Sequence, residues 1–486
     1  MPFSLLIALF LAFGTDSPAN LGPIPRSELA PKLREILLGV SLVALVAGVL
    51  GRWVAFRASQ RGKPSPGLRR LHAWGARGLE GLTLAVYGWM IHDVGWPWVV
   101  HSGWGFRGAI LIDEMLILLP FLLMQLAGWW GLYPAERALR IRGDVGLGRH
   151  LALKARGSLG MVLPVVLLFA AGQDLAHRLW PKAAESLWAL PVGLIVMGGL
   201  VLVLSPIFVR LAWPTHPLPP GPLRHRLERL ARRFGFRCTD ILVWDTGHGV
   251  VNAGVTGALP WFRYVLLSDA LVDCLDDHQI AAVFGHEIGH IAHRHLPYFG
   301  FFFLGSLGVM ALVFWAIDVS PLAGSSTALR DDPAVTMLLH GGTTLATVGL
   351  YFLVVFGFVS RKFERQADVF GCRAVSCGRA GCPPHLDPNG ASGDVPATAA
   401  LCPVGIRTFA NALANVATLN GMEHGRRSWR HGSIARRIAF LEGLEGQPDA
   451  ERRFQRGVSR LRLVLALGLI AAALVAWSND SFPHLR

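Results

Sequence analysis

The stretch AAVFGHEIGHIAHRH, residues 281–295, contains an HExxH pentapeptide formed by His286, Glu287 and His290. On a helix, residues four positions apart project in the same direction, so the imidazoles of His286 and His290 can bind one metal ion. Glu287 then lies beside the metal, where a carboxylate can take a proton from a metal-bound water. The alternative is a buried helix whose histidines are satisfied by neighbouring side chains.

The residues around this pentapeptide predict a helix. Asp276, followed three residues later by Gln279, is typical of a capping box at a helix start. Apolar residues then recur at helical spacing on one face, and Pro297 is expected to end the helix. These apolar residues are Ile280, Phe284, Ile288 and Ile291.

A catalytic zinc ion normally keeps three protein ligands, so a third ligand has to be found. The metzincin pattern would need glycine at position 293 and histidine at position 296, but these positions hold His293 and Leu296. We therefore expect His293 and His295 to be solvated or interfacial side chains rather than ligands.

A better source of the third ligand is the segment SRKFERQADVFG, residues 360–371. Glu364 and Asp368 are four residues apart and face the same way on a helix. Glu364 would complete a site of two histidines and one glutamate, and Asp368 would accept a hydrogen bond from a ligand imidazole. The alternative is a solvated helix in which Glu364 pairs with Arg361 or Arg365.

The composition indicates a membrane protein. Of the 486 residues, 52% are hydrophobic and only 16% are charged, whereas charged residues make up about a quarter of an ordinary soluble protein. An N-terminal run, residues 3–14, is shorter than a span, so an uncleaved anchor and a signal peptide both stay open. The apolar runs that predict membrane spans are Ile36 to Phe56, Leu82 to Val100, Ala109 to Leu132, Leu159 to Ala171, Leu187 to Trp213, Phe299 to Ile317, Ala334 to Val359 and Leu461 to Trp477.

The net charge of +14 is distributed as a membrane topology requires. Basic residues gather in the loops after the first and third spans, which the positive-inside rule places in the cytoplasm. The same alternation places residues 281–295 and 361–460 on the cytoplasmic side, and it argues against nucleic acid as a partner. The six cysteines then face a reducing compartment, so we expect no disulfide framework. We interpret residues 377–402 as a surface loop, and the alternative is a second metal site formed by Cys377, Cys382, His385 and Cys402.

Together, HEIGH, two intervening spans and SRKFERQAD resemble the integral-membrane zinc endopeptidases that include the CAAX prenyl protease and the HtpX-type quality-control protease. VVNAGVTG, with Asn252, is similar to the family's strand before the zinc helix, and HGSIARRI, with His431 and Arg437, is similar to its late motif. Gly432 stands where that motif usually has proline. The resemblance is specific from about Leu204 to Leu441, and five leading spans match the CAAX prenyl protease arrangement better than the HtpX arrangement.

The resemblance implies a mostly α fold: a polytopic transmembrane helical bundle with a cytoplasmic, gluzincin-like zinc metalloprotease domain that contains a small β segment. Six segments are expected: 1–34, the N-terminal hydrophobic segment and loop; 35–213, five transmembrane helices; 214–298, the segment with HEIGH; 299–359, a transmembrane hairpin; 360–458, with the third ligand and the Cys-containing insert; and 459–486, a C-terminal transmembrane helix.

The resemblance also implies a function. One Zn²⁺ per chain would be held by His286, His290 and Glu364, with Glu287 as general base and Asp368 behind a ligand. Asn252, His431 and Arg437 would lie near the substrate, and the partners would be a peptide or protein substrate and the lipid bilayer. CAAX processing and membrane-protein quality control both stay open, as do a transporter and a non-catalytic scaffold. Only five lysines accompany the many arginines, which favours a GC-rich bacterial host and a plasma-membrane location.

Overall fold

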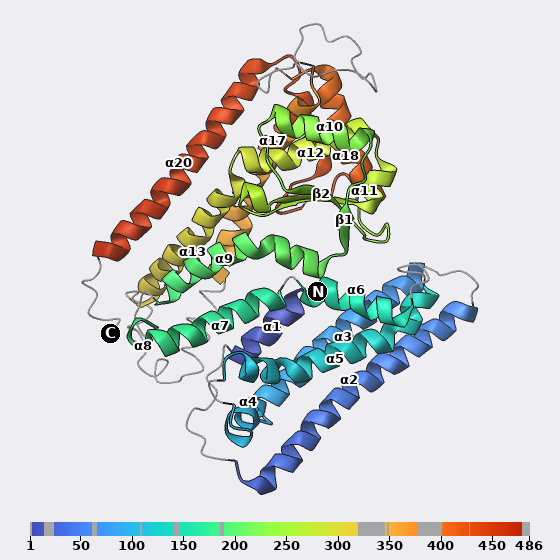
Figure 1. Ribbon diagram of the computed structural model, residues 1–486, viewed down its shortest axis with the longest axis vertical. Coiled ribbons are helices and arrows are strands. Elements are labelled where there is room, and N and C mark those ends of the chain that lie inside the picture. Colours follow the sequence, from blue (N-terminus) through green and yellow to red (C-terminus); the bar gives the residue numbers. More distant parts are fainter. Residues whose placement is uncertain are drawn as a thin grey trace. The chain divides into compact units, whose positions relative to one another are not determined.

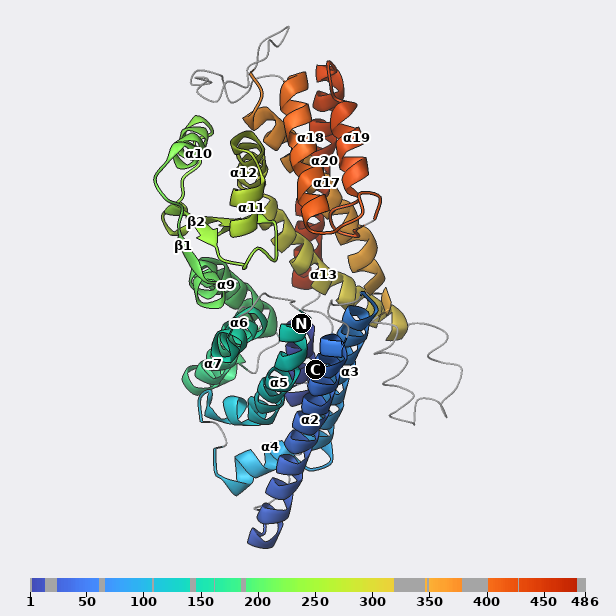
Figure 2. The same ribbon diagram turned by 90° about the vertical axis from the view of Figure 1, so that its right-hand side faces the viewer.

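The computed structural model describes residues 2–13, 24–60, 66–106, 109–139, 146–160, 162–184, 189–318, 346–347, 349–377, 401–426 and 428–478. The chain separates into two compact units, shown in Figures 1 and 2. Unit 1 comprises Met1–His216, Trp244–Gly249 and Thr256–Tyr264, and unit 2 comprises Pro217–Val243, Val250–Val255 and Val265–Arg486. The six segments expected from the sequence stay a prediction.

Unit 1 is built from helices, and its longest pair, α2 and α5, packs at very short range. A Cβ atom at Gly51 of α2 would lie 1.9 Å from the carbonyl oxygen of Gly131 in α5, so only glycine fits at this crossing. The helices of unit 1 are α1 (Pro2–Phe13), α2 (Arg26–Gln60), α3 (Pro66–His92), α4 (Trp96–Trp98), α5 (Ile112–Ala138), α6 (Leu147–Leu159), α7 (Leu163–Leu179), α8 (Pro181–Ala184) and α9 (Ala189–Ala212).

Among the described residues, three helices are long and apolar enough to cross a bilayer: Ser27–Gln60, Ile112–Ala138 and Ile195–Ala212. The pair Leu147–Leu159 and Leu163–Leu179, bent by 50°, would make a fourth if it forms one span. The expected run from Leu82 to Val100 is not one helix, because α3 ends at His92 and Gly95 takes a left-handed conformation with φ of 74°. Of the expected run from Ala334 to Val359, residues 334–345 and 348 lie outside the described residues, and the others are helical.

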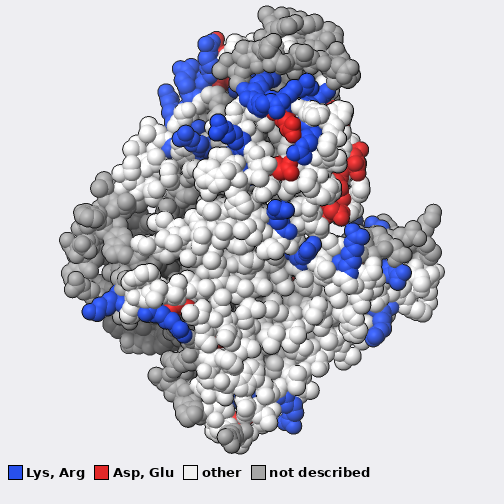
Figure 3. All heavy atoms as spheres, in the orientation of Figure 1, with Lys and Arg blue, Asp and Glu red and all other residues white. Residues whose placement is uncertain are grey.

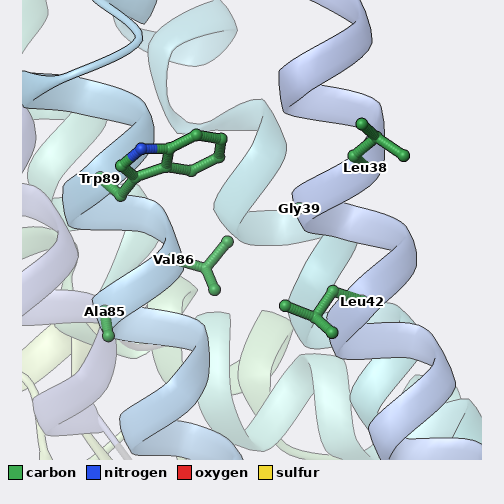
Figure 4. Close-up of a pocket in the computed structure, with 6 residues that line it drawn as sticks. All are labelled: Leu38, Gly39, Leu42, Ala85, Val86 and Trp89. Carbon is green, nitrogen blue, oxygen red and sulfur yellow. The ribbon is translucent and has the colours of Figure 1, made fainter.

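The surface of unit 1 is apolar where a bilayer would contact it. Leu37, Leu45 and Phe56 of α2 are each at least 60% exposed, and Figure 3 shows wide areas without charged side chains. Figure 4 shows a groove between α2 and α3, lined by Leu38, Gly39, Leu42, Ala85, Val86 and Trp89. This groove carries no ionisable side chain and offers no catalytic chemistry.

Unit 2 holds most of a small sheet together with long helices. The sheet has the strand order β1-β2-β4-β3, which leaves β3 at an edge. Its strands are β1 (Thr215–Pro217), β2 (Asp240–Trp244), β3 (Ala253–Thr256) and β4 (Tyr264–Ser268). Its helices are α10 (Pro222–Arg233), α11 (Asp269–Cys274), α12 (Asp277–Ala292), α13 (His295–Asp318), α17 (Gly357–Ala374), α18 (Pro403–Leu419), α19 (Ile434–Glu442) and α20 (Pro448–Ser478). The predicted mostly helical membrane fold with a small β segment is confirmed.

Helix α12 starts as the sequence predicts and ends differently. The Asp276 side chain accepts hydrogen bonds from the backbone N–H groups of His278 and Gln279, the expected N-cap. The prediction that Pro297 ends this helix is wrong. The helix ends at Ala292, Arg294 takes a left-handed conformation with φ of 54°, and Pro297 lies in the first turn of α13.

Candidate metal centre

Helices α12 and α17 bring His286, His290 and Glu364 together. The two Nε2 atoms lie 3.2 Å apart, and the Glu364 carboxylate oxygens lie 3.7 Å from His286 Nε2 and 3.8 Å from His290 Nε2. Tetrahedral ligands about 2.0–2.1 Å from a zinc ion are separated by roughly 3.3 Å. Two imidazoles and a carboxylate at this spacing therefore fit a zinc ion with one coordination position open.

Small residues allow the two helices to approach closely enough for this arrangement. A Cβ atom at Gly285 would lie 2.4 Å from the Ala374 side chain, and one at Gly289 would lie 2.9 Å from the Phe370 side chain. Each glycine directly precedes one of the two histidines of the HExxH motif on α12. The glycines in FGHEIGH were a signal for close helix packing that the sequence analysis did not use.

Asp368 lies behind His286 and is itself held by Arg437. Its Oδ1 atom is 3.0 Å from His286 Nδ1, so Nε2 is the nitrogen that faces the metal position. Arg437 donates from Nε to Oδ2 at 2.8 Å and from Nη2 to Oδ1 at 2.5 Å. Burial alone would raise the pKa of Asp368, but the charge and hydrogen bonds of Arg437 outweigh it and lower that pKa.

The pKa shifts of the two histidines run in opposite directions. Burial alone would lower the pKa of His286, but the hydrogen bond and charge of Asp368 raise it. Burial, and then the charge of His286, lower the pKa of His290 to about 4. His290 is therefore neutral at neutral pH, whereas a metal ion has to compete with a proton for His286 Nε2.

Glu364 is surrounded by positive and hydrogen-bonding groups. His431 Nδ1 lies 3.1 Å from Glu364 Oε1, and Arg437 Nη2 lies 3.6 Å from Oε2. Burial alone would raise the pKa of Glu364, but the hydrogen bond from His431 and the charge of Arg437 hold it below its usual range. The carboxylate is thus kept ionised, the form that binds a metal.

His295 is where the sequence interpretation fails. We expected a solvated or interfacial side chain, but only 1% of His295 is exposed, and its Nδ1 atom lies 2.9 Å from Nδ1 of His290. The expectation assumed one continuous helix. The turn at Arg294, which no simple residue pattern announces, returns the chain so that His295 lies behind His290. His293 is partly buried and is not part of the ligand group.

Glu287 lines a cavity of about 800 Å³ together with His286, His290 and Glu364. Burial raises the pKa of Glu287 to about 7, which suits a group that must accept and return a proton near neutral pH. Asn252 lines the same cavity beside the edge strand β3, and its backbone oxygen accepts a hydrogen bond from Ser268 N. An extended peptide could pair with this strand edge.

His431 enters the site on a short hairpin. Ser428 and Gly432 exchange two backbone hydrogen bonds, and Gly432 has φ of 77°. Proline at position 432 would lose the N–H donor and could not take this φ. Gly432, which stands where the late motif usually has proline, therefore takes a backbone conformation that proline could not adopt.

The structure places the three expected substrate-binding residues around the same cavity. The side chain of His431 is 47% exposed, whereas Arg437 is only 7% exposed and holds Asp368. A second group of carboxylates, Asp113, Glu114 and Asp174, lies within unit 1, but it contains no imidazole.

Comparison with known proteins gives a consistent result. Residues 217–381 match the model of Peptidase family M48, and this range includes His286, Glu287, His290 and Glu364. The chain is 30% identical over 229 residues to the CAAX prenyl protease 1 homolog of Arabidopsis thaliana, covering 44% of this chain and 51% of the relative.

Two further relatives match over similar lengths. CAAX prenyl protease 1 of Saccharomyces cerevisiae is 30% identical over 43% of this chain and 51% of its own length. A Protease HtpX homolog of Pyrobaculum islandicum is 29% identical over 40% of this chain and 55% of its own length. The chain thus spans about half the length of these relatives.

Among solved structures, that of S. mikatae Ste24p matches with a TM-score of 0.43 and 16% identity, covering 86% of this chain and 99% of that one. The resemblance expected from the sequence is confirmed by the family match and the curated relatives.

Proposed function

We propose that this chain, which carries a Peptidase family M48 domain at residues 217–381, is a membrane-embedded, zinc-dependent endopeptidase. The observation that carries the proposal is the group His286, His290 and Glu364, whose ligand atoms lie within 4.8 Å of one another. Glu287 lines the same cavity and supplies the acid–base group that peptide hydrolysis needs.

A bound zinc ion would polarise the scissile carbonyl and make a water molecule more acidic. The carboxylate of Glu287 takes the proton from the attacking water and passes it to the leaving amine. Asn252 and the β3 edge bind the substrate in an extended conformation, and His431, half-exposed in the cavity, contacts it near the reacting bond. Arg437 acts on the reaction by holding Asp368 and Glu364.

The test of this function is a comparison of Glu287→Gln with wild type. The variant should keep one zinc ion per chain and lose hydrolysis of casein, because the amide cannot accept the proton. Glu442→Gln, an exposed glutamate on α19, is the matched control and should keep both properties. Cleavage by Glu287→Gln at the wild-type rate would contradict the mechanism, whereas a wild type that does not cleave casein would favour a transporter or scaffold.

Substrate and location are part of the same proposal. The relatives named CAAX prenyl protease 1 support CAAX processing as the function, and those named Protease HtpX homolog support a protease of another, broader substrate class. We place the protein in a bacterial plasma membrane with the site on the cytoplasmic side, a host in which the broader substrate class fits better. Cleavage of a farnesylated peptide but not of its unmodified form would instead support CAAX processing.

A further inference from the structure

The two histidines of the metal centre are supported differently. His286 has the carboxylate of Asp368 behind its Nδ1 atom, whereas His290 has the imidazole of His295. We propose, on the basis of the zinc site proposed above, that His295 is the positioning residue for His290 and that Gln366 connects it to the C-terminal helix α20.

One assignment of protons satisfies the whole chain of contacts. If His290 binds a metal through Nε2, its neutral ring carries the proton on Nδ1 and donates it to Nδ1 of His295, 2.9 Å away. His295 then carries its own proton on Nε2 and donates it to Oε1 of Gln366, 3.1 Å away. The other neutral tautomer of His295, with the proton on Nδ1, would place its N–H group against the Nδ1–H group of His290.

Gln366 is fixed in the orientation that this assignment needs. Its Oε1 atom also accepts a hydrogen bond from Arg462, and its Nε2 atom donates to Oε1 of Gln455. Turning the amide over would place its NH₂ group against the N–H groups of both Arg462 and His295. Both Gln455 and Arg462 belong to α20, and Figure 2 shows α20 beside α17, which carries Gln366.

The His295 ring is also held mechanically. It stacks on Phe363 with ring centroids 4.4 Å apart and an angle of 3° between the planes. The guanidinium of Arg462 lies against two aromatic rings, 5.2 Å from the centroid of the Tyr298 ring and 5.6 Å from the centroid of the Phe363 ring. A buried ring between these neighbours cannot swing away, so the acceptor stays aimed at His290.

This arrangement gives the C-terminal helix a defined role. The chain of hydrogen bonds runs from α20 through Gln366 on α17 and His295 on α13 to His290 on α12. Because His295 is neutral, it orients His290 without adding negative charge. Loss of such a partner of a metal-binding histidine typically weakens metal binding by about 10–100-fold.

The test uses the purified full-length protein in detergent and measures the zinc Kd by competition with a chromophoric chelator. His295→Phe keeps the ring stacked on Phe363 but cannot accept a hydrogen bond, and it should raise the Kd about 10–100-fold. His295→Asn places an amide oxygen near the position of Nδ1 and should restore zinc binding to within a few fold. The d–d spectrum of the Co²⁺-loaded protein should change in the Phe variant and not in the Asn variant.

His293→Phe is the matched control, because the His293 ring stacks against His295 with centroids 5.8 Å apart but takes no part in the chain of hydrogen bonds, and its Kd should equal that of wild type. If His295→Phe does not fold, Gln366→Leu is the substitute test. It removes the hydrogen-bond partner of His295 and should also raise the zinc Kd. An unchanged Kd in His295→Phe, or an equal loss of affinity in His295→Asn, would overturn the proposed role of His295. Neither result would contradict the proposed zinc site. Failure of the wild type to bind one zinc would overturn the proposed function instead.

Discussion

Replacing Asp368 by asparagine should separate the orientation of His286 from its charge. In the best rotamer the amide oxygen takes the place of Oδ1, so it can still accept from His286 Nδ1 and from Arg437 Nη2. The NH₂ group then faces Arg437 Nε, which now donates to Oδ2 at 2.8 Å. The substitution therefore keeps the geometry at His286 and loses the negative charge and one buried hydrogen bond.

The magnitudes follow from these contacts. A hydrogen bond to a charged group contributes about 1.5–3 kcal/mol and a neutral one about 0.5–1.5 kcal/mol. Changing the bond at His286 from charged to neutral should thus cost about 1–1.5 kcal/mol, roughly a tenfold weaker zinc Kd. Asp368→Ala removes the acceptor altogether and should approach a loss of about 100-fold. Both values are measurable by chelator competition.

Asp449→Asn is the control for this series, because Asp449 is an exposed carboxylate on α20 that pairs with nearby Arg452. Its Kd for zinc should not change. The reasoning would be refuted if Asp368→Asn bound zinc as tightly as wild type, or if it bound as weakly as Asp368→Ala.

Other consequences are open to direct measurement. Glu364→Ala should lose stoichiometric zinc in an elemental analysis, whereas His293→Ala should keep it; retained zinc in the first variant would rule out Glu364 as a ligand. Gly285→Val should lower the free energy of unfolding by about 1–3 kcal/mol, because its Cβ would lie 2.4 Å from the Ala374 side chain. Gly300→Ala, with no atom within 4 Å of the added Cβ, should not lower it. Dialysis against a chelator should abolish proteolysis and one equivalent of zinc should restore it; activity that survives zinc-free dialysis would argue against a metallopeptidase.

Sequence alone predicted the parts of the site that depend on regular helices. The capping pattern at Asp276 and the spacing of His286 and His290 placed the first half, and the spacing of Glu364 and Asp368 placed the second. The structure brings these four side chains together. Helical periodicity is a local property, so it can be read from one segment at a time.

The rest of the fold depends on features that periodicity does not report. His295 was misassigned because the left-handed residue Arg294 breaks the helix. The apolar run after Leu82 was expected to be one span, but the left-handed Gly95 divides it. Of the run from Leu159 to Ala171, only Leu159 belongs to α6, and α7 begins at Leu163. At Arg294 and Gly95 a single backbone conformation decides the outcome, and a hydropathy average does not detect it.

The two halves of the metal centre lie on helices that are far apart in the sequence, with α12 supplying the histidines and α17 supplying Glu364. A zinc ion bound there would cross-link the two helices, and it would bind only when they are docked. By mass action, a ligand at 100 times its Kd adds about 2.7 kcal/mol to the stability of the state that binds it. The availability of zinc would then affect the stability of the folded chain as well as the proposed activity.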